Sequence, residues 1–517
     1  MAEYKVLITT SGMGSRLGDL TKYTNKSLVR IGNKPAISHI IESYPEETKF
    51  VITIGHYGQH IQDFLEMAYP QKSFDFVNVD IFDGEGSSLI YSLLCAKDKI
   101  NCPFIFHVGD AIIKDHNFKV VNNNWVAGYK KNNSSQYRTF NVDSKKVTHF
   151  NEKGELNHDY VYVGVAGIKD YKDFWEKLEH IYSKDKLNRS LSDVHVIRDL
   201  IKTKEINYIE INNWYDIGNT SELQKTRSKF PSDMNVLDKI DENIFMFENF
   251  VIKFFSDPII AKNRATRGKI LEEVTPKILD YKNNFFKYEK AAGNLFSRTV
   301  TPKKFKYFLD WLDKYLWTNE NTDLEEKNHD FYFNKTNERI NKYFDKFNEN
   351  SKIINGSKIP TISDLLSELN KEYMCKGISS RIHGDLILDN VIETENGFSL
   401  IDWRQDFAGE LETGDIYYDL AKLNHNLIFN HFLVESGNFK INEKNKVINC
   451  DILVSKNLLD CREILHKFIV DKGYDLKKVK ILTAIIWINM APLHEYPLNK
   501  FLFNFGKYNL FREIDQK

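Results

Sequence analysis

Cysteine is scarce in this sequence. Five cysteines occur in 517 residues, none as a CxxC pair and none at the spacing of metal ligands. Disulfide frameworks of secreted proteins and zinc modules are therefore disfavoured. An odd number of thiols in a long chain fits a reducing compartment, so we expect a cytoplasmic protein with unreactive cysteines. They are Cys95, Cys102, Cys375, Cys450 and Cys461.

Long apolar runs and an excess of charge of one sign are also missing. The longest apolar stretch near the end of the sequence, residues 481–491, is too short to span a bilayer and predicts a buried helix. The first residues show no basic segment followed by an apolar one, so we predict no signal peptide. The formal net charge is -1, which disfavours nucleic acid and membrane as partners.

The composition itself is that of an ordinary globular protein. Hydrophobic residues make up 42% of the sequence and charged residues 28%. The length allows two or three domains with proper cores. No internal repeat or low-complexity tract occurs, and the oligomeric state stays open, a homo-oligomer included.

The first part of the chain alternates between strand-like and helix-like segments. Such a rhythm predicts an α/β domain with a parallel, doubly wound (Rossmann-like) sheet and helices on both of its faces. Ligands of these folds bind at the carboxyl ends of the strands. The expected strands are residues 4–10, 49–54, 74–79 and 104–108, and the expected helices are residues 35–44, 59–67 and 88–97.

A polar, proline-containing segment at residues 225–237 predicts a domain boundary. It gives a first domain over residues 1–228 and a second over residues 238–517. Residues 242–255 predict a hairpin of two short strands. From about residue 300 the pattern is mostly helical, apart from a strand-loop-strand segment at 380–403.

A glycine-rich turn follows the first expected strand. Gly12 and Gly14 would let backbone N–H groups approach a phosphate chain closely, and Arg16 and Lys26 would neutralise its charge. The turn matches neither the dinucleotide-binding pattern nor the P-loop, so those two classes are disfavoured. A purely structural tight turn would explain the glycines equally well.

The order of motifs in this part of the chain resembles the sugar-1-phosphate and phosphocholine nucleotidyltransferases. The resemblance rests on GMGSRLGDLTKYTNKSLVRIGNKPAISHIIE at 12–42, GEGSSL at 84–89, FHVGDA at 106–111, NEKG at 151–154 and NWYDIGNTSEL at 213–223. It covers roughly residues 1–225. Asn25 and Gly154 stand where many relatives have proline, which leaves the geometry of two loops open.

This resemblance implies transfer of a nucleotidyl group from an NTP to an acceptor phosphate. Asp110 and Asp216 would hold Mg²⁺, since both follow apolar runs and that ion prefers oxygen ligands. Arg16 and Lys26 would stabilise the triphosphate and the departing pyrophosphate. Asp216 as a simple turn residue remains an alternative.

The same resemblance assigns two further turns. Gly86 and Ser87 would contact the nucleotide, and Glu152 and Lys153 the acceptor phosphate. A solvated surface lysine is the alternative for Lys153.

The segment RIHGDLILDNVIETENGFSLIDWRQDF at 381–407 resembles the choline kinase and aminoglycoside phosphotransferase superfamily. Asp385 and Asn390 have the spacing of the kinase catalytic loop, and Asp402 follows the next apolar strand. GDIYYDLAKL at 414–423 matches the helix start that this family carries next. The resemblance implies a two-lobed, protein-kinase-like α+β domain, with an N-lobe at about 238–300 and a C-lobe at about 301–517.

Phosphoryl transfer from ATP assigns roles within that motif. Asp385 would orient the acceptor hydroxyl and take its proton, while Asn390 and Asp402 would hold Mg²⁺ against the ATP phosphates. Lys253, in the middle of a strand, would grip those phosphates, unless it is an edge lysine facing water.

Two details of the second domain stay open in the sequence. The partner carboxylate of Lys253 would be Glu272 or Glu273, and residues 288–296 resemble the hinge that meets adenine. An acidic cluster that follows Asp402 would bind a cationic substrate or, as we prefer, form a solvated loop and a helix start. Its members are Asp406, Glu410, Glu412, Asp415 and Asp419.

Together the two motif sets predict a bifunctional enzyme. One half phosphorylates a small alcohol or sugar with ATP, and the other couples the phosphate to CTP or a sugar-type NTP. The product would be an NDP-activated precursor of a bacterial surface polysaccharide or lipid. The alternative is a nucleotidyltransferase with a regulatory pseudokinase domain, although all four motif aspartates are present.

Overall fold

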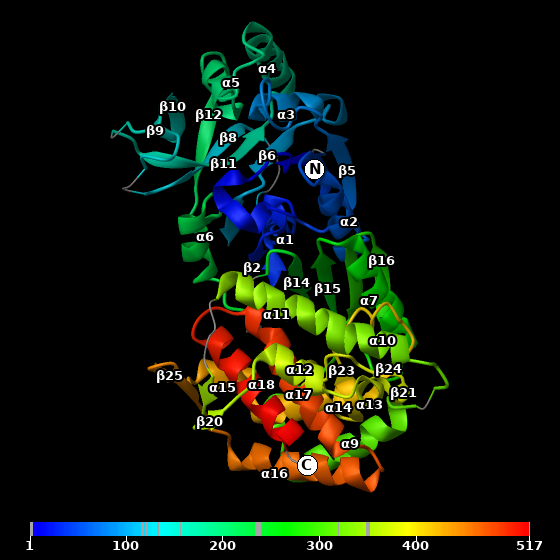
Figure 1. The fold of residues 1–517 in the computed structure, drawn as a ribbon. Helices are drawn as coiled ribbons and strands as arrows, with labels where there is room; N and C mark the ends of the chain where they lie inside the picture. The colour runs from blue at the N-terminus through cyan, green and yellow to red at the C-terminus, as the bar shows by residue number, and fades with distance from the viewer. Residues whose placement is uncertain are drawn as a thin grey trace. The chain divides into compact units, whose positions relative to one another are not determined.

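The computed structural model describes residues 4–114, 118, 122–131, 134–155, 157–232, 239–318, 320–347 and 352–515. Contacts divide the chain into two compact units (Figure 1). The first comprises Met1–Pro258 and Asp280–Lys287, and the second Ile259–Leu279 and Tyr288–Lys517. The segment in which we expect the domain boundary precedes the first crossing between units, and its residues 233–237 lie outside the described ranges. The division at 228 and 238 stays a prediction.

A nine-stranded sheet forms the frame of the first unit, in the order β5-β4-β1-β6-β11-β8-β12-β10-β9. Its first four strands are parallel. They are β5 (Ser73–Asn78), β4 (Lys49–Ile54), β1 (Lys5–Thr9) and β6 (Phe104–Val108). The remaining five are β11 (Tyr160–Ile168), β8 (Asn124–Tyr129), β12 (Ile206–Glu210), β10 (Lys146–Asn151) and β9 (Thr139–Asp143).

The four predicted strands are parallel, but the sheet continues beyond β6 with strands that were not predicted. Strand β11 runs antiparallel to both β6 and β8, so the sheet is mixed. Among the described residues between β6 and β11 there is no helix. Parallel neighbours need a crossover connection, whereas antiparallel strands do not, which explains the change of direction.

Helices cover both faces of this sheet, as the sequence predicts. Side chains alternate along β1, so Val6 and Ile8 enter one core and Leu7 the other. The first core contains residues of α1 (Ala36–Ile41) and α2 (Gly58–Ala68). The second contains residues of α3 (Leu89–Cys95), α4 (Tyr171–Lys184) and α5 (Asp193–Ile201). The first unit is therefore a doubly wound α/β fold.

The predicted hairpin at 242–255 forms, and it packs within the first unit. Strands β14 (Glu242–Met246) and β15 (Phe250–Phe255) are antiparallel and belong to a four-stranded sheet with β17 (Phe285–Glu289) and β16 (Ile278–Lys282). Phe245, Ile252, Phe254 and Phe285 are buried in the same core as Phe64 of α2. The ring centroids of Phe64 and Phe245 are 5.3 Å apart.

The second unit is mostly helical. The predicted strand-loop-strand segment is the antiparallel pair β22 (Val391–Thr394) and β23 (Gly397–Leu400). A second hairpin, β25 (Phe439–Lys444) and β26 (Val447–Ile452), was not expected, because its sequence is polar and most of β25 is exposed. The principal helices are α7 (Pro258–Ile270), α9 (Pro302–Tyr315), α11 (Lys335–Lys346), α14 (Ile416–Ile428), α16 (Lys456–Asp471), α17 (Leu476–Met490) and α18 (Leu498–Asp515).

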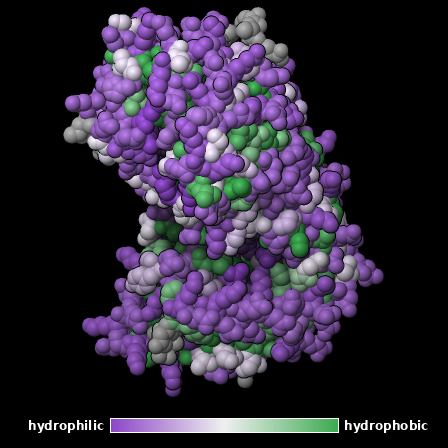
Figure 2. All heavy atoms as spheres, turned by 90° about the horizontal axis from the view of Figure 1, so that it is seen from above, coloured by the Kyte–Doolittle hydropathy of each residue, from purple (hydrophilic) through white to green (hydrophobic). Residues whose placement is uncertain are grey.

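The apolar stretch at 481–491 lies mainly in α17 and is buried, as predicted. Within the described ranges, no helix combines the length and the apolar character needed to cross a membrane. Figure 2 shows a face covered mainly by hydrophilic residues, with hydrophobic ones scattered among them.

Candidate active sites

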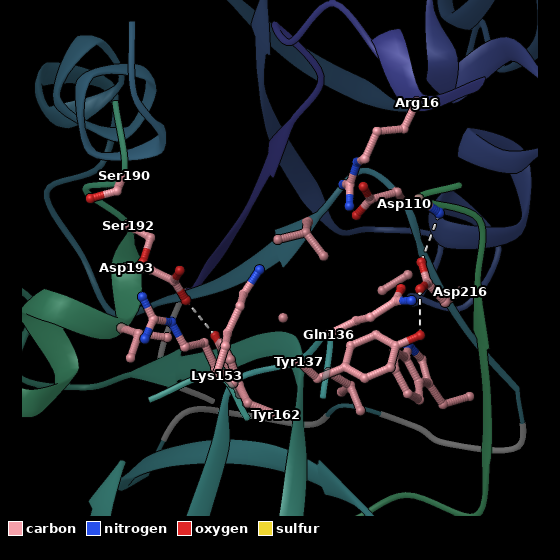
Figure 3. A pocket seen from close by; sticks show the side chains of 18 residues that line it. Arg16, Asp110, Gln136, Tyr137, Lys153, Tyr162, Ser190, Ser192, Asp193 and Asp216 are labelled. Carbon is pink, nitrogen blue, oxygen red and sulfur yellow. Dashed lines mark hydrogen bonds between the residues drawn. The ribbon is translucent and has the colours of Figure 1, made fainter. Parts of the chain in front are cut away.

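A cavity of about 490 Å³ opens in the first unit (Figure 3). Cationic, acidic and aromatic side chains line it together, which suits a ligand that carries phosphate groups. The lining includes Arg16, Asp110, Gln136, Tyr137, Arg138, Lys153, Tyr162, Ser192, Asp193, Trp214 and Asp216.

Two short strands bring Asp110 and Asp216 to one side of this cavity. Asp110 follows β6 and precedes β7 (Ala111–Lys114), which pairs antiparallel with β13 (Asn213–Asp216). The Ile217 N–H donates to the Asp110 carbonyl oxygen over 3.2 Å. A Cβ atom on Gly218 would lie 3.0 Å from Asp216 Oδ1 and 3.6 Å from Asp110 Oδ2. Both carboxylates therefore lie close to a residue that has no side chain.

The two carboxyl groups differ in charge environment. Burial alone would raise the pKa of Asp110, but Lys26 and Arg16 bring that pKa below its ordinary value. Lys26 Nζ lies 2.9 Å from Asp110 Oδ2. Burial and the negative charge of Asp110 raise the pKa of Asp216. Asp216 thus lacks the neighbouring positive charge that would offset its burial and the charge of Asp110.

Asp216 is nevertheless held in place by two hydrogen bonds. The Tyr137 hydroxyl donates to Asp216 Oδ2 over 2.8 Å, and the Gly218 N–H donates to Oδ1 over 2.7 Å (Figure 3). Tyr137 escaped the sequence analysis, since nothing in its neighbourhood resembles a catalytic motif.

Asp110 and Asp216 fit the ligand set of a magnesium ion. The part of the chain that the structure describes has no cluster of three or more His, Cys, Asp or Glu side chains that could hold a metal. Two carboxylates are enough for Mg²⁺, which completes its shell with phosphate oxygens and water. A cation there would also relieve the repulsion that raises the pKa of Asp216.

The glycine-rich turn positions Lys26. Gly14 has a φ of 67°, and a Cβ atom there would lie 2.8 Å from Lys26 Cβ. Glycine therefore permits both the left-handed backbone and the close approach of the lysine. A Cβ atom on Gly12 would meet nothing within 4 Å, so space around that backbone is open.

Asn25, a departure from the family pattern, anchors the same loop. Its buried side chain donates to the carbonyl oxygens of Thr10 and His56 over 2.8 and 2.7 Å, and it accepts from the Ser27 N–H over 2.9 Å. The loop therefore keeps a defined path without the proline found in many relatives.

The predicted nucleotide turn lies at the start of α3. Gly86 has a φ of 83°, and the Ser87 hydroxyl donates to the Gly84 carbonyl oxygen over 2.7 Å. Neither residue lines the cavity.

Lys153 lies in the cavity, whereas Glu152 does not. Burial lowers the pKa of Lys153, and so do the positive charges of Arg138 and Arg16. Glu152 instead forms ion pairs with Arg138 and Arg198. Arg138 was missed by sequence reasoning, although it adds a third cation to the lining.

The second unit brings the predicted catalytic-loop residues together. Asn390 Nδ2 donates to the Asp385 carbonyl oxygen over 2.9 Å and lies 3.4 Å from Asp385 Oδ2. Lys422 Nζ lies 2.6 Å from Asp385 Oδ1. Burial would raise the pKa of Asp385, but Lys422 more than offsets this effect and lowers it. The proposed base is therefore ionised.

Asp402 lies on a strained turn next to this loop. Its φ is 59°, which is unusual for a residue with a side chain, and Arg264 Nη1 lies 2.5 Å from its Oδ1 atom. The Ile401 N–H donates to the Asn390 carbonyl oxygen over 2.8 Å. The structure thus places the segment carrying Asp402 beside the one carrying Asn390.

Two members of the acidic cluster have structural partners. Asp419 accepts the N–H groups of His383 and Gly384 over 2.8 and 2.7 Å. Asp415 accepts the Tyr332 hydroxyl over 2.9 Å. Both aspartates are fully buried at the start of α14, so for them the predicted helix start is found but the predicted solvation is not.

Lys253 is buried in β15 and has a different carboxylate neighbour from the one we expected. Its Nζ lies 3.6 Å from Glu242 Oε1, on the adjacent strand. Glu272 and Glu273 follow the end of α7 at Ile270 and are not on the helix. Glu273 pairs with Arg381 at 3.2 Å.

Comparisons with known proteins concern the first part of the chain. Residues 5–233 match the family model described as nucleotidyl transferase. The "bifunctional protein GlmU" of Methanocaldococcus jannaschii is 25% identical over 255 residues, which are 48% of this chain and 60% of that protein. The low-salt glycan biosynthesis nucleotidyltransferase Agl11 of Haloferax volcanii is 30% identical over 115 residues, 22% of this chain and 31% of that protein. The chain thus spans less than two thirds of either relative.

Solved structures give similar coverage. The CTP:phosphocholine cytidylyltransferase LicC of Streptococcus pneumoniae is 18% identical and covers 44% of this chain and 99% of its own, with a TM-score of 0.38. A nucleoside-diphosphate-sugar pyrophosphorylase of Vibrio cholerae is 15% identical and covers 43% and 99%, also with a TM-score of 0.38.

Proposed function

We propose that this chain, whose N-terminal part is a nucleotidyltransferase domain, is a bifunctional enzyme. The first activity transfers a nucleotidyl group from an NTP to the phosphate of a sugar or small alcohol. The second makes that phosphate from ATP and the free acceptor. The observation that carries the first activity is the placement of Asp110 and Asp216 in one cavity with Arg16 and Lys153.

The transferase reaction joins two polyanions, so its main need is positive charge in fixed positions. An oxygen of the acceptor phosphate attacks the α-phosphorus of the NTP, and the bond to the β-phosphate oxygen breaks to release pyrophosphate. Arg16 and Lys26 would stabilise the triphosphate, and Lys153 with Arg138 would hold the acceptor phosphate. Mg²⁺ held by Asp110 and Asp216 would neutralise phosphate charge.

Release of pyrophosphate tests this activity. Purified chain with Mg²⁺, each NTP in turn and a panel of sugar 1-phosphates and phosphorylated amino alcohols should form pyrophosphate with at least one pair. Asp110→Asn and Asp216→Asn should each abolish it. Absence of pyrophosphate with every pair in the panel would refute the transferase proposal.

The kinase half of the proposal rests on Asp385, Asn390 and Asp402. The acceptor hydroxyl oxygen would attack the γ-phosphorus of ATP, Asp385 would take the hydroxyl proton, and ADP would leave. Asn390 and Asp402 would hold Mg²⁺. An NDP-activated product would then serve the synthesis of a surface polysaccharide or lipid in the cytoplasm.

A regulatory pseudokinase is the second candidate for the C-terminal half. It is favoured by the ion pairs that Arg264 and Lys422 make with Asp402 and Asp385, since both carboxylates already have partners. ADP release in the presence of acceptor, lost in Asp385→Asn with pyrophosphate release retained, would support the kinase. Stabilisation by ATP without any ADP release would support the pseudokinase.

A further inference from the structure

A group of four cationic side chains in the second unit reaches Asp385 through one of its members, Lys422. Lys422 of α14 contacts Asp385 directly, at 2.6 Å. Arg404 lies against the catalytic loop: its N–H donates to the His383 carbonyl oxygen over 3.0 Å, and a Cβ atom on Gly384 would lie 2.8 Å from Arg404 Cβ. Lys335 and Arg339 follow on α11 (Figure 1). We call Lys335, Arg339, Arg404 and Lys422 the cationic cluster.

The four charges of the cationic cluster interact with one another. Lys335 Nζ and Arg404 Cζ lie 3.7 and 4.9 Å from the centroid of the same ring, that of Phe331. Burial lowers the pKa of Lys335 well below its ordinary value, and repulsion from Arg404, Arg339 and Lys422 adds to this effect. Burial and Arg404 likewise lower the pKa of Arg339.

Little negative charge balances this cluster. Within the described part of the chain, Lys335, Arg339 and Arg404 make no ion pair, and the buried Nε atom of Arg404 has no hydrogen-bond partner. Asp406 attracts Lys335 and Glu338 attracts Arg339, both without forming an ion pair, and the Asp406 carboxylate accepts the Gly409 N–H over 2.9 Å. Partly buried cations without counter-charge are unfavourable unless a ligand supplies that charge.

A local irregularity of the helix lies directly before Lys335. The π-helical turn η4 (Asp330–Asn334) lies between α10 (Glu325–His329) and α11 and carries Phe331. Such turns are uncommon and occur frequently at functional sites.

We propose that the acceptor of the kinase site carries an oxyanion, a carboxylate or phosphate, that binds the cationic cluster. The acceptor is then an acidic alcohol and not a quaternary amine such as choline. This inference rests on the proposed kinase function, and it narrows the substrate of that same site. A bound oxyanion would provide the negative charge that Lys335, Arg339 and Arg404 lack.

The contact of the cluster with Asp385 through Lys422 assigns the oxyanion to the acceptor. Asn390, which would hold Mg²⁺ and the ATP phosphates, approaches Asp385 Oδ2. Lys422, a member of the cationic cluster, contacts the other oxygen, Oδ1. The cluster therefore approaches the base from the oxygen that the metal ligand leaves open. The γ-phosphate of ATP is the other source of the same chemistry, and the experiment separates the two.

The first arm measures ADP release by the full-length chain with D-glycerate, glycerol 3-phosphate, glycerol and choline. We expect kcat/KM to be at least about tenfold higher for an acidic acceptor than for glycerol or choline. Arg339→Gln should reduce this preference at least about tenfold, whereas Lys342→Gln, on the exposed face of the same helix, should not. Preference for choline or glycerol would overturn the inference and leave the kinase proposal standing.

The second arm measures binding of inorganic phosphate by calorimetry and requires no turnover. It uses a Lys26→Met background, which weakens phosphate binding in the first unit. Arg339→Gln and Arg404→Gln should each raise the Kd for phosphate at least about tenfold, and Lys342→Gln should leave it unchanged. Thermal unfolding of each variant shows that it is folded.

The outcomes of the second arm separate the two proposals. Equal phosphate binding in all variants overturns the anion site. Displacement of phosphate by ATP without an acceptor assigns the cationic cluster to the nucleotide and overturns the acceptor assignment. Loss of phosphate binding in both arginine variants, together with no ADP release from any acceptor, supports the anion site and refutes the kinase proposal.

Discussion

Asp216 is a carboxyl group under opposing influences. Burial and Asp110 raise its pKa, while the hydrogen bonds from the Gly218 N–H and the Tyr137 hydroxyl lower it. Only the ionised form binds a cation well, so transferase activity should fall on acidification at a higher pH than an unperturbed carboxyl would predict.

Replacing Tyr137 tests this balance. Tyr137→Phe removes a hydrogen bond that favours the carboxylate, so the pKa of Asp216 should rise further. The acid limb of kcat/KM for pyrophosphate release should then move to higher pH, while activity at alkaline pH changes little. Tyr23→Phe, at the surface, is the control. An unmoved acid limb would show that Asp216 does not govern the pH dependence.

The glycine-rich turn packs closely against Lys26. Lys26→Met removes a cation 2.9 Å from Asp110, so we expect pyrophosphate release to fall about a hundredfold. ADP release from the second unit should be unchanged. Lys22→Met, on the exposed part of the same loop, should retain full activity. A similar loss in both variants would point to the fold of the loop and not to the charge of Lys26.

At the scale of elements, helix α14 holds the catalytic loop through Asp419. Asp419→Ala leaves the buried N–H groups of His383 and Gly384 without their acceptor, and we expect a loss of about 3 kcal/mol in the free energy of unfolding. Urea denaturation measures this change. Glu463→Ala, exposed on α16, should stay within about 0.5 kcal/mol of the parent protein. Equal stability of the two variants would contradict the anchoring role.

Element positions in the first unit followed well from the sequence, because buried strands and amphipathic helices have clear periods. The predicted strand at 49–54 coincides with β4, and the hairpin at 242–255 also forms. Hairpin β25–β26 escaped prediction because β25 is largely polar and mostly exposed. Strand β11 was not among the predicted strands, so the antiparallel neighbour of β6 was not predicted either.

Residues of the candidate sites could be predicted from the sequence where they belong to a recognisable motif. Asp110, Asp216 and Lys153 do meet in one cavity. Tyr137 and Arg138 were not predictable, since they reach the cavity through the tertiary fold alone. The carboxylate near Lys253 was sought on the next helix by spacing, whereas the structure provides Glu242 on the adjacent strand.

At the scale of the whole molecule, the segment that matches the family ends before the residues that complete its core. Residues 242–255 lie beyond the family match, which ends at 233, yet Phe245, Phe247 and Phe254 share a core with α2. Stability of the transferase part should therefore depend on residues outside the matched segment.

Phe245→Ala tests this dependence. Loss of a ring that is 1% exposed should destabilise the first unit by about 3–5 kcal/mol, so pyrophosphate-forming activity should be lost at a lower temperature. Phe305→Ala, equally buried but in the second unit, should leave that temperature unchanged. An unchanged inactivation temperature in Phe245→Ala would show that the hairpin does not support the transferase fold.

The π-helical turn at Asp330–Asn334 has a consequence for how this protein could diverge. Such a turn differs from an α-helical one by a single extra residue, and each residue of a helix rotates the chain by about 100°. Deletion of one codon there would swing Lys335 and Arg339 away from Phe331 and Arg404 in a single genetic event. We therefore expect that deleting one residue of this turn would change the acceptor preference of a descendant enzyme. None of the four residues of the cationic cluster would have to be replaced.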